Sequence, residues 1–483
     1  MSRFKLIFFV SLVCECHEVR GVERPNVIVI LTDDQGWGDL KSYGHVQLKT
    51  PHIDQLAADG VKLTDCYSSS GCCSPSRAAI LTGRTPYRNG VYHWLNTGRD
   101  LHLKAEEITL PQLLRKNGYQ TAHFGKWHLS HYENKGKEQP KHVFGGEFAD
   151  PRQPTMDAYG YDYCFITGNV ARPSHRNPEN FFRNGKAVGP LQGYSAQLIA
   201  NEVDDWLKMH HQAGKPFFMT VWLHEPHGPI SSDPEFMARY DESFDTKLKQ
   251  YYGNITQIDE AVGAIVNSLK KAGLTDDTLI WYTSDNGPAG DDPDNVKTNF
   301  RGSTGGFRGR KAHTHEGGIR VPGIIKWPAG MMAAGVTPGI VSSEPVIGHD
   351  IFSTVLAVAG VPAPVDRIID GVSILPLLLG KPLKRDRPLY WRNGKQTYRV
   401  AIRDGDWKLL CDSSRSTWTL YNLVDDPKET SDLSKSHPER FQKMKKQLIA
   451  YDNDVLTNGH SWWQKGGWRR NFPAEIVSKA EEK

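Results

Sequence analysis

The stretch NVIVILTDD, residues 26–34, is a run of mostly branched apolar side chains that ends in two carboxylates. Such a run is typical of a central strand in a parallel sheet, because helices cover both faces of that sheet. Two later stretches repeat the pattern: FFMTVWLHEPH from Phe217 and TLIWYTSDNG from Thr278 also end in polar residues. We therefore expect three strands that bring polar groups to one edge of an open α/β sheet, where such sheets place their sites.

Helical patterns separate these strands. Apolar side chains recur on one face over residues 196–211 and again over residues 257–273. A further helix is predicted over about residues 111–118. This alternation of strands and helices from residue 24 to about 375 predicts one large α/β domain.

Beyond about residue 380 the pattern changes to short strand-like pieces. TYRVAIRDGDWKLL from Thr397 carries an Asp-Gly turn between apolar segments, and STWTLYNLVDDP from Ser416 adds another strand. A helical pattern follows over residues 438–455. We predict a main domain over residues 22–380 and a smaller C-terminal α+β subdomain with an antiparallel sheet over residues 381–483.

The N-terminus has the features of a secretory signal. Arg3 and Lys5 precede an apolar run from Leu6 to Val13, which is far shorter than the roughly 20 apolar residues of a membrane span. We therefore expect a signal peptide over residues 1–21, no membrane span, and export to a periplasmic, extracellular or lumenal compartment. A lipid anchor on Cys14 is disfavoured, because the residue before it is not small.

The composition excludes several classes of protein. With 38% hydrophobic and 24% charged residues the chain is globular, and its net charge of +4 is too small to make nucleic acid the expected partner. Five cysteines remain after the predicted signal, which is an odd number and too few for a disulfide framework in so long a chain. Whether Cys66, Cys72, Cys164 or Cys411 form disulfides stays open.

Asp33 and Asp34 stand together at a predicted strand tip. Adjacent carboxylates repel unless a proton or a cation joins them, so a hard divalent metal is expected. A turn or a helix cap is the alternative for such a pair. Asp285 and Asn286, at the end of another predicted strand, complete the kind of oxygen set that Ca²⁺ or Mg²⁺ prefers, whereas no His or Cys cluster of the zinc type accompanies them.

The stretch SSSGCCSPSRAAILTGR, residues 68–84, sets two cysteines before a short predicted helix. Residues 74–76 favour a helix start and Gly83 favours its end. Cys73 therefore lies at or just before a helix N-terminus, where N–H groups and the helix dipole favour an anion, and Arg77 adds a fixed positive charge. A buried structural thiol or half of a disulfide is the alternative for either cysteine.

Further titratable side chains occur in three segments. In GKWHL, Lys126 and His128 alternate, so they would lie on one side of an extended strand. HEPHGP carries His224 and His227 in a loop, and GRKAHTHEGGIRVP carries Lys311 in a Gly-rich loop. Each histidine alone is more often an ordinary hydrogen-bonded residue. Their occurrence with the acid set and the cysteine turn favours a site.

The segment CSPSRAAILTGR, residues 73–84, resembles the signature of the type I sulfatases. LTDDQGWGDL, GKWHL, PHGP, TSDNG and HEGGIRVPGIIKWPAG resemble the other blocks of that family in the same order. The likeness covers residues 24–375 and is closest to arylsulfatases and N-acetylgalactosamine-6-sulfatases. It implies the alkaline-phosphatase-like fold, with a large mixed sheet and helices on both faces. It also implies hydrolysis of sulfate esters on a sulfated carbohydrate, with aryl sulfates as surrogates.

In that family the signature cysteine is oxidised to formylglycine, an aldehyde carried as its hydrate. The register of proline and arginine assigns this change to Cys73 and not to Cys72. The resemblance therefore implies a formylglycine-generating or other maturation enzyme as a partner. It also implies that one hydroxyl of the hydrate attacks sulfur and that sulfate then leaves a covalent sulfo-enzyme as the aldehyde reforms.

The same resemblance implies roles for the remaining residues. One Ca²⁺, or less readily Mg²⁺, would balance the sulfate charge. Its implied ligands are Asp33, Asp34, Cys73, Asp285 and Asn286. The implied cations around the sulfate are Arg77, Lys126 and Lys311. His128 matches the base that assists sulfate release, His227 matches a general acid at the leaving-group oxygen, and His224 has a weaker claim.

The substrate is not determined at this level. A set of basic residues could meet the acidic groups of a polysaccharide or form a solvated loop; these are Arg99, Lys297, Arg301, Arg308 and Arg310. Two rival functions also remain. A phosphatase or phosphonate monoester hydrolase of the same superfamily is disfavoured, because the phosphatase site uses serine or threonine and two metals with histidine ligands. A non-catalytic sugar-binding relative is disfavoured by the complete set of charged site residues.

Overall fold

The main feature of the computed structural model, which describes residues 24–95, 102–130, 154–290, 299–393 and 400–460, is a ten-stranded sheet. Its strand order is β11-β2-β10-β9-β1-β8-β4-β5-β6-β7. The middle holds β1 (Asn26–Thr32), β8 (Phe217–Trp222) and β9 (Thr278–Ser284), with β1 parallel to both neighbours. The prediction that the three apolar runs form central parallel strands is confirmed.

The outer strands make the sheet mixed. β4 is parallel to β8 and β5, whereas β10 is antiparallel to β9 and β2. Their bounds are β2 (Val61–Leu63), β4 (Gln120–Lys126), β5 (Tyr163–Thr167), β6 (Phe182–Arg183), β7 (Lys186–Ala187), β10 (Gly323–Lys326) and β11 (Ile340–Ser342). A separate pair consists of β3 (Cys66–Tyr67) and β12 (Val346–Ile347).

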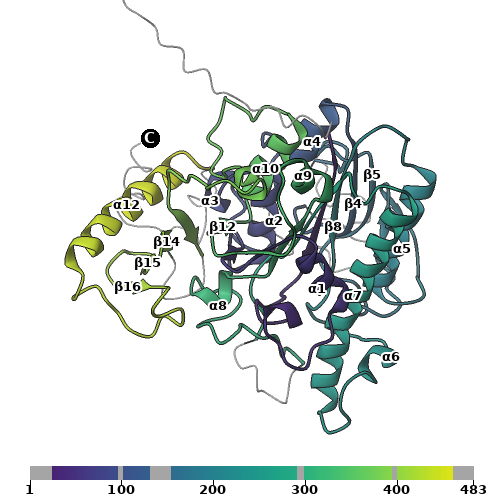
Figure 1. Cartoon of the computed structure of the whole chain (residues 1–483), viewed down its shortest axis with the longest axis horizontal. Helices are drawn as coiled ribbons and strands as arrows, with labels where there is room; N and C mark the ends of the chain where they lie inside the picture. The colour runs from purple at the N-terminus through teal and green to yellow at the C-terminus, as the bar shows by residue number, and fades with distance from the viewer. Residues whose placement is uncertain (1–23, 96–101, 131–153, 291–298, 394–399, 461–483) are drawn as a thin grey trace, which may run out of the picture.

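Helices cover both faces of the large sheet (Figure 1). Val27 and Val29 of β1 pack into the layer formed by α2 (Cys73–Thr82), α4 (Leu110–Lys116), α9 (Pro328–Ala333) and α10 (Asp350–Ala359). Ile28 and Ile30 pack into the opposite layer, formed by α1 (Pro51–Ala58), α5 (Ser195–Met209) and α7 (Thr246–Lys271). Alternate β1 side chains thus enter two cores. The short elements are η1 (Lys41–Tyr43), α3 (Pro86–Asn89), α6 (Pro234–Met237), α8 (Glu316–Ile319) and α11 (Leu375–Leu378).

The predicted helices match α5, α7 and α4, but α7 begins well before the predicted start. The carboxylate of Asp245 accepts hydrogen bonds from the N–H groups of Lys247 and Leu248, which caps the helix at that earlier point. The first turns then bury Tyr251 and Tyr252 against the core. The apolar periodicity detected only the later, aliphatic part of this helix.

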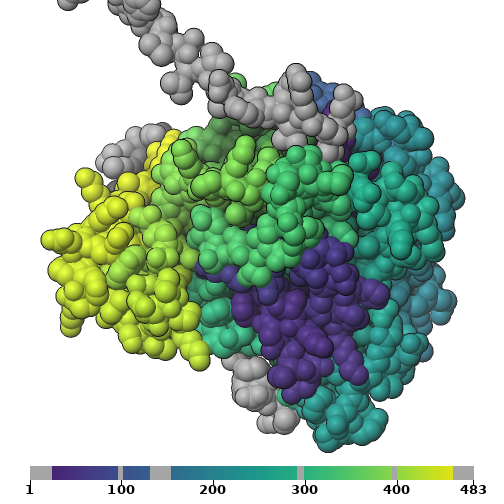
Figure 2. Space-filling model, viewed as in Figure 1, coloured from purple at the N-terminus to yellow at the C-terminus, as the bar shows by residue number. Residues whose placement is uncertain are grey.

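The C-terminal part forms a four-stranded antiparallel sheet with one helix on it. The strands are β13 (Leu389–Arg392), β14 (Val400–Asp404), β15 (Trp407–Cys411) and β16 (Trp418–Asn422), and the helix is α12 (Pro438–Thr457). Met444 and Leu448 of α12 enter the core on one face, while Trp391 packs toward Tyr67 of the main part on the other. Figure 2 shows the yellow surface of the C-terminal part continuous with the green part of the surface.

The described residues contain no helix that is long and apolar enough to cross a membrane. The predicted signal peptide, residues 1–21, lies outside the described residues.

Candidate active site

The predicted cysteine turn begins helix α2. Cys73 is its first residue, and Cys72 before it has an extended backbone. The helix ends where Gly83 adopts a left-handed conformation with φ of 68°, as predicted for this glycine. Cys73 is buried, with only 2% of its surface exposed. Its side chain therefore sits at a helix N-terminus inside the molecule.

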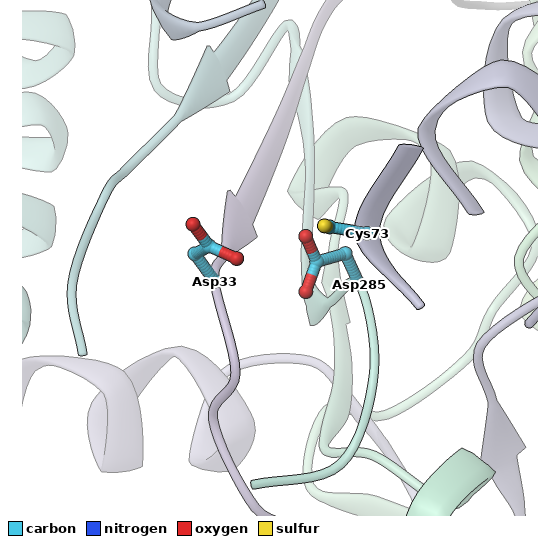
Figure 3. A group of neighbouring side chains, drawn as sticks. All are labelled: Asp33, Cys73 and Asp285. Carbon is cyan, nitrogen blue, oxygen red and sulfur yellow. The ribbon is translucent and has the colours of Figure 1, made fainter. Parts of the chain in front are cut away.

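Two acidic residues from neighbouring strands face Cys73 (Figure 3). Thr32 of β1 pairs in register with Ser284 of β9, so the next residues, Asp33 and Asp285, leave the sheet side by side. The Cys73 Sγ and one carboxylate oxygen from each aspartate all lie within 4.8 Å of one another. Both aspartates are fully buried. The parallel register thus brings together residues that are about 250 positions apart in the chain.

Asp34 and Asn286 complete the oxygen cluster. Asp34 has a left-handed φ of 68°, and its Oδ1 accepts a 2.7 Å hydrogen bond from Nδ2 of Asn286. Three buried oxygens of this cluster have no hydrogen-bond partner among the described residues: Oδ1 of Asp33, Oδ2 of Asp34 and Oδ1 of Asn286. Buried polar atoms rarely stay unpaired, and oxygens alone are what a hard cation requires. The residues therefore fit a hard divalent cation.

Each of the three carboxylates is paired with a cation. Nη2 of Arg77 donates to Oδ2 of Asp285 at 2.7 Å, with Nε of the same arginine at 2.9 Å. Nζ of Lys126 lies 2.6 Å from Oδ2 of Asp33. Nζ of Lys311 lies 2.6 Å from Oδ1 of Asp34. Arg77 and Lys126 are fully buried, whereas the Lys311 side chain keeps 19% of its surface exposed.

Burial and these charges shift the pKa values in opposite directions. Burial alone would raise the pKa of Asp33, but the charges of Lys126, His227 and Arg77 hold it well below the usual carboxyl value. Burial and the neighbouring charge of Asp33 raise the pKa of Asp285 to about 7. Burial also raises the pKa of the Cys73 thiol. The encoded thiol is therefore not an activated thiolate.

His128 lies in the site, but not as predicted. β4 ends at Lys126, and His128 has a left-handed φ of 53°, so the two residues do not share one side of an extended strand. At this turn the N–H groups of Trp127 and His128 donate to the carbonyls of Thr167 and Gly168. The imidazole is buried, and its Nε2 lies 3.0 Å from the Leu95 carbonyl. Burial and the charge of Lys126 hold its pKa well below the usual histidine value.

The two histidines of the HEPHGP loop have different surroundings. His224 is buried, and its Nε2 lies 2.7 Å from Oγ1 of Thr167. The side chain of His227 is a quarter exposed, its Nδ1 lies 2.7 Å from the Gly228 carbonyl, and its Nε2 lies 3.7 Å from Oδ2 of Asp34. His227, Asp33 and Asp34 form a second group of potential metal ligands. His227 is not among the metal ligands expected from the sequence.

A cluster of aromatic side chains beside Arg77 was not predicted from the sequence. The Arg77 guanidinium lies 5.1 Å from the ring centre of Trp222, the last residue of β8. Trp127 stacks on Trp222, with His123 against the edge of both. This contact holds the cation in a water-poor environment. Its sequence signal was only a tryptophan at the tip of an apolar run.

Five basic residues were candidates for contacts with an acidic polysaccharide. The three that the structure describes form hydrogen bonds or ion pairs within the protein. Arg301 pairs with Asp245 at 3.2 Å, Arg308 donates to the Glu429 carbonyl, and Arg310 donates to the Gly302 carbonyl. These contacts favour a structural role for the three arginines. Arg99 and Lys297 lie outside the described residues.

The other cysteines that the structure describes do not belong to the cluster of Cys73, Asp33 and Asp285. Cys66, Cys164 and Cys411 are buried thiols. Cys72 places its Sγ 3.8 Å from Oδ1 of Asn393, at the end of β13. Of the two adjacent cysteines, only Cys73 belongs to the described cluster with the aspartates.

Family models and known proteins resemble the chain over most of its length. The model described as Sulfatase matches residues 25–361, and the model described as N-sulphoglucosamine sulphohydrolase, C-terminal, matches residues 305–454. The N-acetylgalactosamine-6-sulfatase of Mus musculus is 35% identical over 418 residues, which cover 82% of this chain and 73% of that protein. The steryl-sulfatase of Homo sapiens is 31% identical over 447 residues, covering 79% of this chain and 74% of that protein.

A solved structure is similar to the whole fold. It is the crystal structure of Ps i-CgsB in complex with k-i-k-neocarrahexaose, 26% identical, with a TM-score of 0.78 over 94% of this chain and 99% of that one. Sequence and fold therefore agree over both the large mixed sheet and the C-terminal sheet. From this agreement we conclude that the protein belongs to the type I sulfatase family, has its alkaline-phosphatase-like fold, and is a sulfuric ester hydrolase.

Proposed function

We propose that the protein hydrolyses sulfate esters on a sulfated carbohydrate, with formylglycine at position 73 and one bound Ca²⁺. One observation carries this proposal: the side chain of Cys73 lies within 4.8 Å of carboxylate oxygens of Asp33 and Asp285 at a helix N-terminus. Arg77, Lys126 and Lys311 surround the same point. A sulfate group needs this arrangement of fixed positive charge around the attacking group.

The proposed metal ligands are the oxygens of Asp33, Asp34, Asp285 and Asn286, together with residue 73. Three of these oxygens are unpaired among the described residues, which supports a cation between them. The oxygen-only set supports Ca²⁺ over Mg²⁺, because Mg²⁺ usually keeps several waters and is rarely held by a site built of protein ligands alone. Bound there, the ion would balance sulfate charge and lower the pKa of the attacking hydroxyl.

The formylglycine hydrate would supply one hydroxyl for attack on sulfur and a second whose deprotonation releases sulfate. Around it, the buried Arg77 and Lys126 would hold the inner sulfate oxygens, and the partly exposed Lys311 would meet the outer ones. We assign to His128 the role of proton acceptor during sulfate release.

His227 is the proposed general acid. Its Nδ1 faces the Gly228 carbonyl, which can only accept, so Nδ1 carries a hydrogen and Nε2 faces the site. A protonated Nε2 could therefore donate to the leaving oxygen. Its partial exposure supports contact with a substrate that arrives from solvent.

Sulfated sugars are the proposed substrates, with aryl sulfates as surrogates. Support comes from two similar proteins, an N-acetylgalactosamine-6-sulfatase and a protein of the same fold solved with k-i-k-neocarrahexaose. Steryl-sulfatase, however, is also similar. Release of sulfate from N-acetylgalactosamine 6-sulfate, a carrageenan oligosaccharide and a steroid sulfate, compared by ion chromatography, separates these classes.

The remaining proposals concern maturation and location. A formylglycine-generating or similar enzyme would act on the chain, and export would follow from the signal at residues 1–21. The division into residues 22–380 and 381–483 stays a proposal. It is supported by the separate sheet that begins at β13.

The decisive experiment is mass spectrometry of the tryptic peptide that spans residues 63–77. We expect the mass loss that accompanies conversion of a thiol to an aldehyde, located by fragment ions at Cys73. Cys73→Ala should abolish turnover of an aryl sulfate, whereas Cys72→Ala should remain convertible. An unmodified peptide from cells that convert a control sulfatase would instead favour a phosphoryl-transfer or non-catalytic function.

A further inference from the structure

The backbone of Leu95 connects Ser74, at the start of α2, to the imidazole of His128. The N–H of Leu95 donates to Oγ of Ser74 at 3.0 Å, and the carbonyl of Leu95 lies 3.0 Å from Nε2 of His128. Ser74 is fully buried and Leu95 nearly so. Ser74 directly follows Cys73, so this chain links the residue next to the nucleophile with the histidine of the site.

The chain of contacts determines which nitrogen of His128 carries the hydrogen. A backbone carbonyl can only accept a hydrogen bond, so Nε2 must be the donor. In the neutral ring Nδ1 is then the atom with a free lone pair. Nδ1 is buried and has no hydrogen-bond partner among the residues that the structure describes. It is therefore the nitrogen that can receive a proton.

From this geometry we propose that Ser74 is a positioning residue. Through the N–H and carbonyl groups of Leu95 it holds His128 as the tautomer with hydrogen on Nε2 and the lone pair on Nδ1. The backbone of His128 is left-handed, so neither a strand nor a helix orients the ring. The hydrogen bond at Nε2 supplies that orientation instead. Without the Ser74 hydroxyl, the N–H of Leu95 loses this partner, and the Leu95 backbone that carries the carbonyl facing His128 is less firmly held.

The inference rests on the proposed function and specifies one proton transfer in it. When sulfate leaves residue 73, the bond between its carbon and the sulfate oxygen breaks and the electron pair departs with sulfate. The second hydroxyl on that carbon loses its proton to Nδ1 of His128, and the O–H electron pair forms the carbonyl. Attack on sulfur does not need this transfer, so Ser74 should affect release and not attack.

The tautomer can be read directly by NMR of protein labelled with ¹⁵N-histidine, with His128 assigned by comparison with His128→Gln. In the wild-type protein we expect a protonated Nε2 and a bare Nδ1. Ser74→Ala should give a mixture of tautomers, whereas Ser74→Thr, which keeps the hydroxyl, should retain the wild-type signals. A wild-type His128 protonated at Nδ1 overturns the proposal without any substitution at Ser74.

Kinetics supply the second measurement. Formylglycine content is measured first, and rates are expressed per converted site, because Ser74 adjoins the modified residue. Ser74→Ala should slow sulfate release about 10- to 100-fold, so that quenched enzyme gains the mass of one sulfate group. Ser130→Ala is the matched control, since it removes a buried hydroxyl that accepts from Trp127 and not from the Leu95 chain; it should release sulfate at the wild-type rate.

A double-mutant comparison decides whether Ser74 acts through His128. In a His128→Gln background, Ser74→Ala should cause no further loss in the release rate. A further loss, a slower rate with unchanged His128 signals, or a wild-type rate in Ser74→Ala would each overturn the proposal. Failure of the proposed function looks different, because wild-type protein would then lack formylglycine or sulfatase turnover altogether.

Discussion

Three buried carboxylates and three cationic side chains surround Cys73, so the effect of replacing any one of them depends on the others. Asp285 bonds Arg77 through two nitrogens, and burial together with Asp33 raises its pKa to about 7. A cation bound beside these groups would favour their ionised forms. Metal binding and charge at the site are therefore coupled.

Replacing Asp285 should weaken metal binding and activity together. Asp285→Ala removes a charged ligand and leaves Arg77 without its carboxylate, so we expect a fall in turnover of at least about 100-fold and a loss of bound calcium. Metal content by plasma mass spectrometry and aryl sulfate turnover provide the check. Asp59→Ala, a carboxylate paired with Lys326 outside the site, is the control. Calcium content equal to the wild type would remove Asp285 from the metal site.

His227 should matter most for poor leaving groups. An alkoxide leaving from a sugar needs a proton, whereas a nitrophenolate does not, so His227→Gln should reduce sugar sulfate turnover by about 10² or more but aryl sulfate turnover far less. Burial lowers the pKa of His227 below the usual histidine pKa, so the imidazole gains its second proton only at a correspondingly lower pH. Turnover of the sugar sulfate should therefore decline as pH rises through that pKa. Equal losses for both substrates would contradict the assignment.

At the scale of elements, strand register and helix ends carry the site. The pairing of Thr32 with Ser284 places Asp33 beside Asp285, and α2 presents Cys73 to both. In the C-terminal part, α12 is held on its sheet by the fully buried Asp452. This carboxylate bonds Arg392, Arg415 and Tyr390.

Asp452 should make the docking of α12 dependent on pH. Burial opposes its ionisation, but the charges of Arg392 and Arg415 keep its pKa below the usual carboxyl value. Its stabilising contribution is therefore present above the unfolded carboxyl pKa of about 4 and is lost as pH falls below it. Asp452→Asn should lower the free energy of unfolding at neutral pH by about 3 kcal/mol and flatten the acid limb of a plot of melting temperature against pH.

The control for this prediction is Asp454→Asn, two residues further on, whose carboxylate is 40% exposed and pairs with Arg88. It should cost less, because solvent already screens that pair. If both variants had the same melting temperature at every pH, Asp452 would not be the anchor of α12.

At the scale of the whole molecule, buried charges join the C-terminal sheet to helix α8 of the main part. Nζ of Lys408, on β15, lies 2.8 Å from Glu316 of α8 and 2.9 Å from Glu429, with all three side chains shielded from solvent. Trp391 of β13 also donates to the Ser68 carbonyl, just before the cysteine turn. The C-terminal sheet therefore supports segments that carry site residues.

Breaking this junction should destabilise the protein as one unit. Lys408→Met leaves the buried Glu429 without its cation and Glu316 with Arg320 as its remaining partner, so we expect a loss of about 3–5 kcal/mol in the free energy of unfolding. Chemical denaturation measures it, with Lys443→Met at an exposed position as the control. Adding Glu316→Gln and Glu429→Gln to Lys408→Met should recover part of the loss. Separate unfolding transitions for the two parts in the wild type would contradict a single cooperative unit.

Local patterns in the sequence were sufficient for much of this architecture. Continuous apolar runs predicted β1, β8 and β9, because only strands covered on both faces can be apolar throughout. The Asp-Gly turn predicted the hairpin of β14 and β15, and Gly83 predicted the end of α2. Each of these features depends on neighbours in the chain.

The tertiary structure alone decided how distant residues meet. Strand register set Asp33 beside Asp285, and a left-handed turn moved His128 off the strand that its spacing had suggested. Arg301 forms an ion pair with Asp245, and the ring of Trp222 lies against the guanidinium of Arg77. Residue types and spacing determine which groups are available and where each element ends, whereas partners, burial and electrostatics depend on long-range packing that no local pattern contains.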